Sequence, residues 1–133
     1  MSTETSRAVV QQFLDHAAEG DIDACFALFS YDASWSNIGS TRFSGTAEGK
    51  EAILNDLVGP LFGSLQDGIR SDIEAVIADG DRVVVLSQGH ATTHDGTPYN
   101  NTYAQVFTVR DGQIVAVKEY MDTALIDAVF GKA

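Results

Sequence analysis

The second half of the chain alternates strand-like runs with short turn signals, and this pattern restricts the possible folds most. The runs are rich in β-branched and aromatic residues and cover residues 69–78, 82–93, 99–109 and 113–121. The segments between them, ADGD, HDGTP and RDGQ, contain Asp-Gly pairs typical of hairpin turns. The second half is therefore predicted to form an antiparallel meander.

The first half carries helical signals instead. Apolar spacing and capping residues predict helices over residues 7–19, 22–29 and 48–62, and a last helical turn over 123–130. Gly20 is suited to end the first helix and Asp21 to cap the second. The third helix is expected to end near Gly59 and Pro60, and Thr123 to cap the last.

Helices first and a long sheet afterwards indicate an α+β fold. A curved sheet with the N-terminal helices over its concave face would form a cone, whose interior is the expected place for a small-molecule site. The length of 133 residues predicts a single domain over residues 1–133.

Composition excludes several classes of partner. Nineteen acidic residues against eight basic ones give a net charge of −11, which repels phosphate backbones and anionic lipids. We therefore expect no nucleic acid and no membrane partner, and a neutral or cationic ligand is favoured. The single cysteine, Cys25, excludes an internal disulfide. With no signal peptide or apolar span of ~20 residues, a cytoplasmic protein is expected.

The stretch DASWSN places an amide beside a large aromatic residue. In a strand, Ala33, Trp35 and Asn37 share one face. If that face points inward, Asn37 is either a hydrogen-bonded structural residue or part of a site that does chemistry. Both interpretations stay open from the sequence.

Two segments of the chain resemble known families. The stretch from residue 8 to 53, with its helix-Gly-Asp-helix order and the segments ALF, DAS and SGTA, resembles the N-terminal half of the ketosteroid isomerases. The ending YAQVFTVRDGQIVAVKEYMD resembles SnoaL-like and limonene-epoxide-hydrolase-like members of the nuclear transport factor 2 superfamily. The resemblance implies a cystatin-like or ketosteroid isomerase-like cone, dimeric through the outer face of its sheet and active without a cofactor.

Three positions depart from the ketosteroid isomerase pattern. The resemblance implies a catalytic carboxylate where this chain has Asn37, and oxyanion-hole donors where it has Phe13 and Gln105. An amide cannot take a proton from carbon, and Phe13 has no hydroxyl group. The usual ketosteroid isomerase chemistry is therefore not expected.

The turn before the last strand decides which residues oppose each other. A two-residue turn at Asp111 and Gly112 would place Glu119 opposite Ala104, whereas a three-residue turn would place it opposite Tyr103. The family pattern favours the three-residue turn, because Gln105 and Glu119 then share the inner wall. Inward-facing residues are then expected at 101, 103, 105 and 107, and in the preceding strand at 84, 86, 88 and 90.

These placements give one candidate constellation. The catalytic candidates are Glu119, His90 and Asn37, and the expected substrate-binding residues are Trp35, Gln88, Tyr103, Gln105, Phe107, Phe13 and Met121. A buried carboxylate beside an imidazole could activate water or move a proton. Each residue also has a purely structural interpretation. Histidines at 16, 90 and 94 are too scattered for a metal site, so no metal is expected.

The leading functional prediction is a cofactor-free enzyme for a small apolar or polycyclic, oxygen-bearing molecule, with isomerase, cyclase, dehydratase or hydrolase chemistry. The rival prediction is a non-catalytic ligand-binding or dimerisation module of the same fold, since one fold serves many functions. A homodimer is expected in either case.

Overall fold

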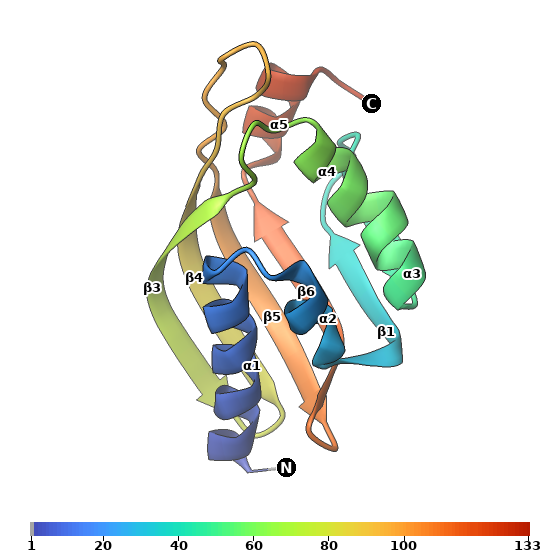
Figure 1. Cartoon of the computed structure of the whole chain (residues 1–133), viewed down its shortest axis with the longest axis vertical. Helices are drawn as coiled ribbons and strands as arrows, with labels where there is room; N and C mark the ends of the chain where they lie inside the picture. Colours follow the sequence, from blue (N-terminus) through green and yellow to red (C-terminus); the bar gives the residue numbers. More distant parts are fainter. Residues whose placement is uncertain (1) are drawn as a thin grey trace.

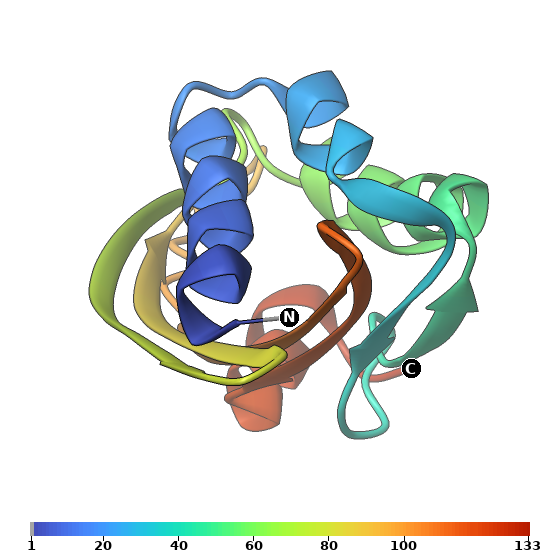
Figure 2. The ribbon, with the colours of Figure 1, turned by 90° about the horizontal axis from the view of Figure 1, so that it is seen from below.

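Six strands form one curved, mixed sheet, and the helices cover its concave side (Figures 1 and 2). The computed structural model describes residues 2–133, and the strand order is β2-β1-β6-β5-β4-β3. The strands are β1 (Phe29–Asn37), β2 (Gly45–Glu48), β3 (Arg70–Asp79), β4 (Arg82–His90), β5 (Thr102–Arg110) and β6 (Gln113–Met121). The predicted α+β architecture and the four C-terminal strands are confirmed.

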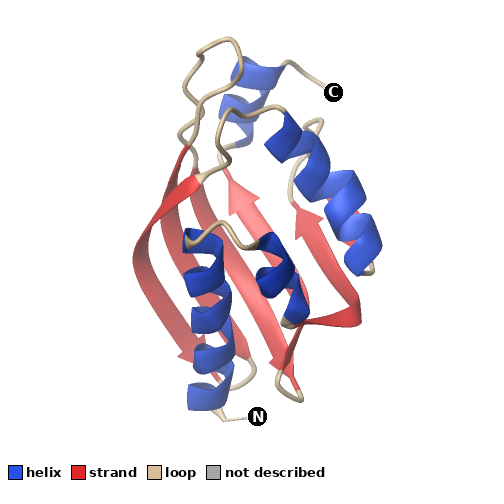
Figure 3. Cartoon of the chain, in the orientation of Figure 1, coloured by secondary structure: helices blue, strands red, loops and turns tan. Residues whose placement is uncertain are grey.

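The helices are α1 (Thr3–Ala18), α2 (Ile22–Ala27), α3 (Lys50–Ala52), the π-helical turn η1 (Ile53–Val58), α4 (Gly59–Gly63) and α5 (Thr123–Phe130). Figure 3 shows them on one side and at one end of the sheet. Within residues 2–133, none of these helices is long and apolar enough to cross a membrane.

Capping side chains explain where the first helices begin. The hydroxyl of Ser2 accepts a bond from the N–H of Thr5 at 3.1 Å, so α1 starts four residues before the predicted position. The carboxylate of Asp21 accepts from the N–H of Ala24 at 3.0 Å, which confirms the predicted cap of α2. At the other end of the chain, Asp122 caps α5 in place of the predicted Thr123.

Residues 48–62 were predicted to form one regular helix, but this segment has three parts. It is α3, η1 and α4 in succession, and it passes Gly59 and Pro60 without ending. The N–H of Gly59 donates to the carbonyl of Leu54, five residues earlier. Pro60 has no N–H to continue the regular ladder, and a Cβ at Gly59 would lie 3.0 Å from the Leu54 oxygen. The π-helical turn therefore accommodates both residues.

Strand β1 begins earlier and has more partners than the sequence indicated. Phe29 belongs to this strand, not to the second helix, and β1 pairs with β6 in parallel. Its other edge pairs with β2, a short strand that was not predicted from the sequence. The parallel register sets Asn37 beside Glu119, and Trp35 beside Val117.

The predicted register of the last hairpin was wrong, but the prediction that Gln105 and Glu119 share the inner wall is correct. Asp111 and Gly112, with φ of 51° and 76°, form a two-residue turn that pairs Arg110 with Gln113. A bulge after Ile114 then shifts the ladder by one residue, so that Glu119 lies opposite Gln105 instead of Tyr103. Gln105 and Glu119 therefore do share the inner wall.

The predicted inner face of β4 was also wrong. Val83, Val85 and Ser87 are buried on the concave side. Because strand residues alternate between faces, Gln88 and His90 lie on the outer face. The strand segment VVVL is apolar on both faces. Its sequence therefore does not show which of the two alternating sets of residues points inward.

The interior contains two separate apolar clusters. The larger one joins α1, α2 and η1 to the sheet and includes Phe13, Phe29 and Phe107. The smaller one lies where α5 covers the end of the sheet and includes Tyr99 and Ile126. Polar side chains occupy the level of the sheet between them.

Asn101 fastens α5 to the sheet and is only 1 % exposed. Its amide donates to the Tyr99 hydroxyl at 3.1 Å and to the Asp122 carbonyl at 3.0 Å. Its oxygen accepts from the N–H groups of Thr102 at 2.8 Å and Asp122 at 3.0 Å. One side chain thus joins the start of β5 to the cap of α5.

Replacement of Asn101 tests this fastening. Asn101→Ala leaves several buried groups unpaired and is expected to lower the free energy of unfolding by about 2–3 kcal/mol in urea titrations. The neighbouring Asn100 is exposed and accepts one bond, from the N–H of Ala91 at 3.3 Å. Asn100→Ala is the matched control, with an expected loss below about 1 kcal/mol. Equal losses for both variants would contradict the fastening role.

Candidate functional site

A row of side chains crosses the inner face between the two apolar clusters. The pairings Asn37–Glu119, Glu119–Gln105 and Gln105–Val85 place one residue from each of four neighbouring strands at the same level. The row below it, Trp35–Val117–Phe107–Val83, belongs to or packs against the larger cluster. The middle row therefore brings three polar side chains to a level between the two apolar clusters.

Glu119 is the one acidic side chain of this row. It is 9 % exposed, and the amide nitrogen of Gln105 donates to its Oε2 at 2.6 Å. Burial raises the pKa of Glu119 to about 7, and the bond from Gln105 only partly opposes this effect. None of the ion pairs found in residues 2–133 involves Glu119. It is a buried carboxyl group without a cation beside it.

Asn37 and Trp35 are bound to each other. The indole Nε1–H of Trp35 donates to the Asn37 oxygen at 3.0 Å, and the Asn37 amide donates to the Phe43 carbonyl at 2.9 Å. The ring of Trp35 also stacks on Phe29 at 6.2 Å with an interplanar angle of 12°. Asn37 thus holds the tryptophan and the following loop in place, so the geometry favours its structural interpretation over a catalytic one.

Several residues of the inner face keep part of their surface exposed at this level. Trp35, Asn37, Gln105 and Met121 all point to the concave side, yet each stays partly exposed. Gln105 lies on a central strand, with β4 and β6 on either side. Its exposure therefore comes from the concave side. On the helical side, Leu54 and Leu57 pack against the larger cluster and Leu61 against the smaller one, and all three are partly exposed.

Tyr103 belongs to a buried hydroxyl chain. It donates to the Tyr99 hydroxyl at 3.2 Å, and burial raises the pKa of both phenols. A Cβ at Gly89 would lie 2.8 Å from the Tyr103 ring, so glycine at 89 leaves the space that this ring needs. Tyr99 was not among the predicted site residues, although the strand predicted over residues 99–109 places it on the same face as Asn101 and Tyr103.

Two of the expected substrate-binding residues are core residues. Phe107 is fully buried, and Phe13 contacts it at a ring-centroid distance of 5.3 Å. Both rings pack in the larger cluster. Met121 packs against the smaller cluster, opposite Tyr103 in the ladder.

His90 and Gln88 lie apart from Glu119, on the outer face. His90 Nε2 lies 2.9 Å from the Asp72 carboxylate, and Arg70 donates to the other Asp72 oxygen at 2.7 Å. Gln88 accepts from the hydroxyl of Thr102 at 2.8 Å. His90 borders a surface hollow of about 450 Å³. The predicted pair of His90 and Glu119 in one cavity is therefore absent.

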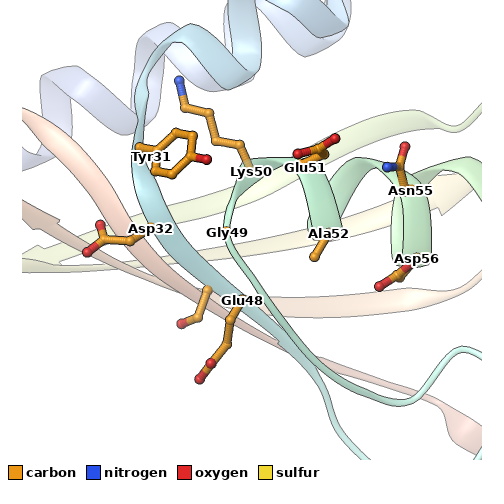
Figure 4. Close-up of a pocket in the computed structure, with 10 residues that line it drawn as sticks. Tyr31, Asp32, Glu48, Gly49, Lys50, Glu51, Ala52, Asn55 and Asp56 are labelled. Carbon is orange, nitrogen blue, oxygen red and sulfur yellow. The ribbon is translucent and has the colours of Figure 1, made fainter.

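A second surface hollow, of about 790 Å³, lies outside the cone between β1, β2 and the start of the α3–η1 segment (Figure 4). Asp32, Glu48, Glu51 and Asp56 line it beside Lys50. None of the predicted site residues borders this hollow. Within residues 2–133, no group of three or more histidine, cysteine or acidic side chains is arranged to hold a metal ion.

Comparison with known proteins places the chain in a family. The model of the SnoaL-like domain matches residues 10–117. No curated protein matches significantly. Among solved structures, TerC co-crystallised with polyporic acid is 22 % identical, with a TM-score of 0.82 over 94 % of this chain and 97 % of that one.

Two further structures have the same fold. An LEH-like epoxide hydrolase of M. tuberculosis is 22 % identical, with a TM-score of 0.74 over 95 % of this chain and 89 % of that one. A ketosteroid isomerase-like protein from Catenulispora acidiphila, in complex with trimethylamine, is 17 % identical, with a TM-score of 0.75 over 94 % and 93 %. The predicted resemblance and the ketosteroid isomerase-like fold are confirmed.

The raised pKa of Glu119 predicts a pH effect on stability. The folded chain holds this proton more tightly than the unfolded chain, so the contribution is complete below about pH 4.5 and is lost as the pH rises to about 7. The Glu119→Gln variant lacks this pH-dependent contribution to stability. Between pH 5 and pH 8, the free energy of unfolding of the variant should therefore gain about 2–3 kcal/mol relative to the wild type.

Urea titrations of both proteins at the two pH values measure this difference. Glu48→Gln, which removes an exposed carboxyl group, is the control and should show no comparable change. A Glu119→Gln variant that follows the wild type at both pH values would refute a proton held by Glu119.

Proposed function

The chain belongs to the SnoaL-like domain family, and we propose that it is a cofactor-free enzyme performing acid–base chemistry on a small, apolar, oxygen-bearing molecule. Its fold is shared with isomerases, cyclases and epoxide hydrolases. Since one fold hosts many reactions, the proposal depends on the inner face of the sheet. The observation that carries it is the buried carboxyl group of Glu119 between the partly exposed residues Asn37 and Gln105.

Glu119 is the proposed proton carrier. A carboxyl group with a pKa of about 7 is present in both protonation states near neutral pH, so it can accept and donate protons there. Gln105 fixes one of its oxygens through the 2.6 Å bond. Trp35, held by Asn37, supports an apolar substrate from the side.

His90 lies on the outer face of the sheet and cannot act together with Glu119, which limits the reactions that the site can catalyse. With one titratable carboxyl group at the inner row, the simplest reaction is a proton transfer in which the same residue removes a proton from a carbon atom and returns it to another atom of the substrate. This requirement favours isomerase- or cyclase-type chemistry over epoxide hydrolysis, which needs one group to activate water and another to protonate the leaving oxygen.

A non-catalytic ligand-binding module is the second candidate. The bonds of Asn37 to Trp35 and Phe43 support it, because they give one of the three predicted catalytic residues a structural function. The two candidates differ in whether a bound molecule exchanges protons with Glu119.

The outer face of the sheet supports the proposed homodimer. Ile77 is 55 % exposed and Tyr120 39 % exposed. Between them, Val84, Leu86 and Val106 are only partly buried on the same face. A second copy of this face would remove these side chains from water.

Substitution of the most exposed apolar residue named on this face tests the dimer. Ile77→Lys introduces a charge that a second copy would have to bury, so the dimer measured by analytical ultracentrifugation should dissociate into monomers. Lys50→Ala, at the hollow beside α3, is the control and should leave the dimer intact. A wild-type monomer at micromolar concentration would refute the proposal.

Proton transfer can be measured without knowing the product. We expect the protein to catalyse deuterium uptake from D2O into one or more members of a panel of enolisable aromatic ketones, followed by mass spectrometry. Glu119→Gln should slow this exchange by about 10²-fold or more. His90→Ala and Glu48→Gln should exchange at the wild-type rate, since both side chains lie away from the inner row.

Unchanged exchange in Glu119→Gln would refute the role of Glu119. If panel members bind without protein-dependent exchange, the ligand-binding module is the correct function.

A further inference from the structure

We propose that the inner face also binds apolar amines as cations, with Glu119 as their counter-ion and the Trp35 ring as their aromatic contact. This inference rests on the proposed binding of ligands beside Glu119, and it adds a class of ligand that would compete with the neutral substrate. The inference follows from the uncompensated charge of Glu119 in the middle row and from the Trp35 ring in the row below it.

All eight basic side chains of the chain lie away from Glu119. Arg7 bonds the Val76 carbonyl, Arg70 pairs with Asp72, and Arg82 and Arg110 pair with Asp81. Lys118 lies over Tyr120 on the outer face, Lys50 borders the outer hollow, and Arg42 and Lys132 are exposed. An ionised Glu119 therefore lacks a partner that buried charges normally have.

A cationic ligand would supply that partner, and an anionic ligand would meet an uncompensated negative charge. The net charge of −11 acts in the same direction, since it attracts cations to the protein and repels anions. Charge alone therefore selects amines over carboxylates, sulfates or phosphates at this site.

Trp35 is placed to contact such a cation. Phe29 covers one side of the indole by stacking, and the bond from Nε1 to Asn37 fixes the plane of the ring. The side chain stays partly exposed on the concave side. Asn37 is the direct neighbour of Glu119 in the sheet and binds the indole nitrogen, so the ring lies next to the row that holds the carboxyl group. Tryptophan is the aromatic residue that attracts cations best.

Glu119 is the group expected to change charge between pH 5 and pH 8 in this space. Gln105 and Asn37, from β5 and β1, are neutral amides. Tyr99 and Tyr103 are phenols whose pKa values burial raises further. The segment η1 contributes apolar side chains, and Asp122, the next acid along the chain, lies beyond the end of β6 and caps α5.

The affinity for a permanent cation should therefore increase with the ionised fraction of Glu119. With a pKa of about 7, half of the carboxyl groups are ionised at pH 7 and about one in a hundred at pH 5. The dissociation constant should thus rise by up to about 50-fold from pH 7 to pH 5.

The test uses benzyltrimethylammonium, whose charge does not change with pH, and its uncharged analogue neopentylbenzene. Trp35 is the only tryptophan, so its fluorescence reports binding beside it. We expect the ammonium compound to bind at least 10-fold more tightly than the analogue at pH 8 and to lose this advantage at pH 5. Glu119→Gln should bind both compounds equally at every pH, whereas the control Glu48→Gln should behave as the wild type.

Equal affinities of the two compounds for the wild type at pH 8 would overturn the proposal, and so would an equal loss in Glu48→Gln. The wild-type pH dependence decides the matter even if Glu119→Gln does not fold. The deuterium-exchange assay separates this failure from that of the proposed function, because Glu119-dependent exchange without preference for the ammonium compound overturns only the amine site.

Discussion

The proposed chemistry and ligand preference of this protein both depend on one constraint: the carboxyl group of Glu119 is buried without a cation beside it. Glu119 reaches the inner face because a bulge in β6 shifts the last hairpin by one residue, which sets it opposite Gln105. The neutral amide supplies a hydrogen bond but no compensating charge. The group therefore keeps its proton to about neutral pH, and its chemistry and its choice of ligands both follow from that condition.

Most of the fold could be predicted from local signals. The Asp21 cap, the Asp111-Gly112 turn and the alternation of the C-terminal strands are encoded within a few residues, and the structure contains all of them. Two features of the fold were not predicted from the sequence. Strand β2 has only four residues and is defined by its pairing with β1, and the π-helical turn results from Gly59 and Pro60 in one continuous helical segment.

The candidate site could be predicted only in part. Trp35, Asn37, Gln105 and Glu119 were correctly placed on one wall, because a resemblance covering both ends of the sheet fixed their faces relative to each other. His90 was misplaced because β4 is apolar on both faces, so a one-residue error in choosing the inner set turned Gln88 and His90 outward. The bond between Trp35 and Asn37 depends on side-chain conformation, which no sequence pattern reveals.

Direct titration of the Glu119 side chain is the measurement closest to the central claim. With ¹³C-labelled glutamate, the carboxyl resonance absent from Glu119→Gln identifies this group, and its chemical shift against pH gives the pKa. A midpoint near pH 7 is the expected result. A midpoint near the ordinary value of about 4.3 would show a carboxylate that is solvated or paired with a cation, and would contradict the account.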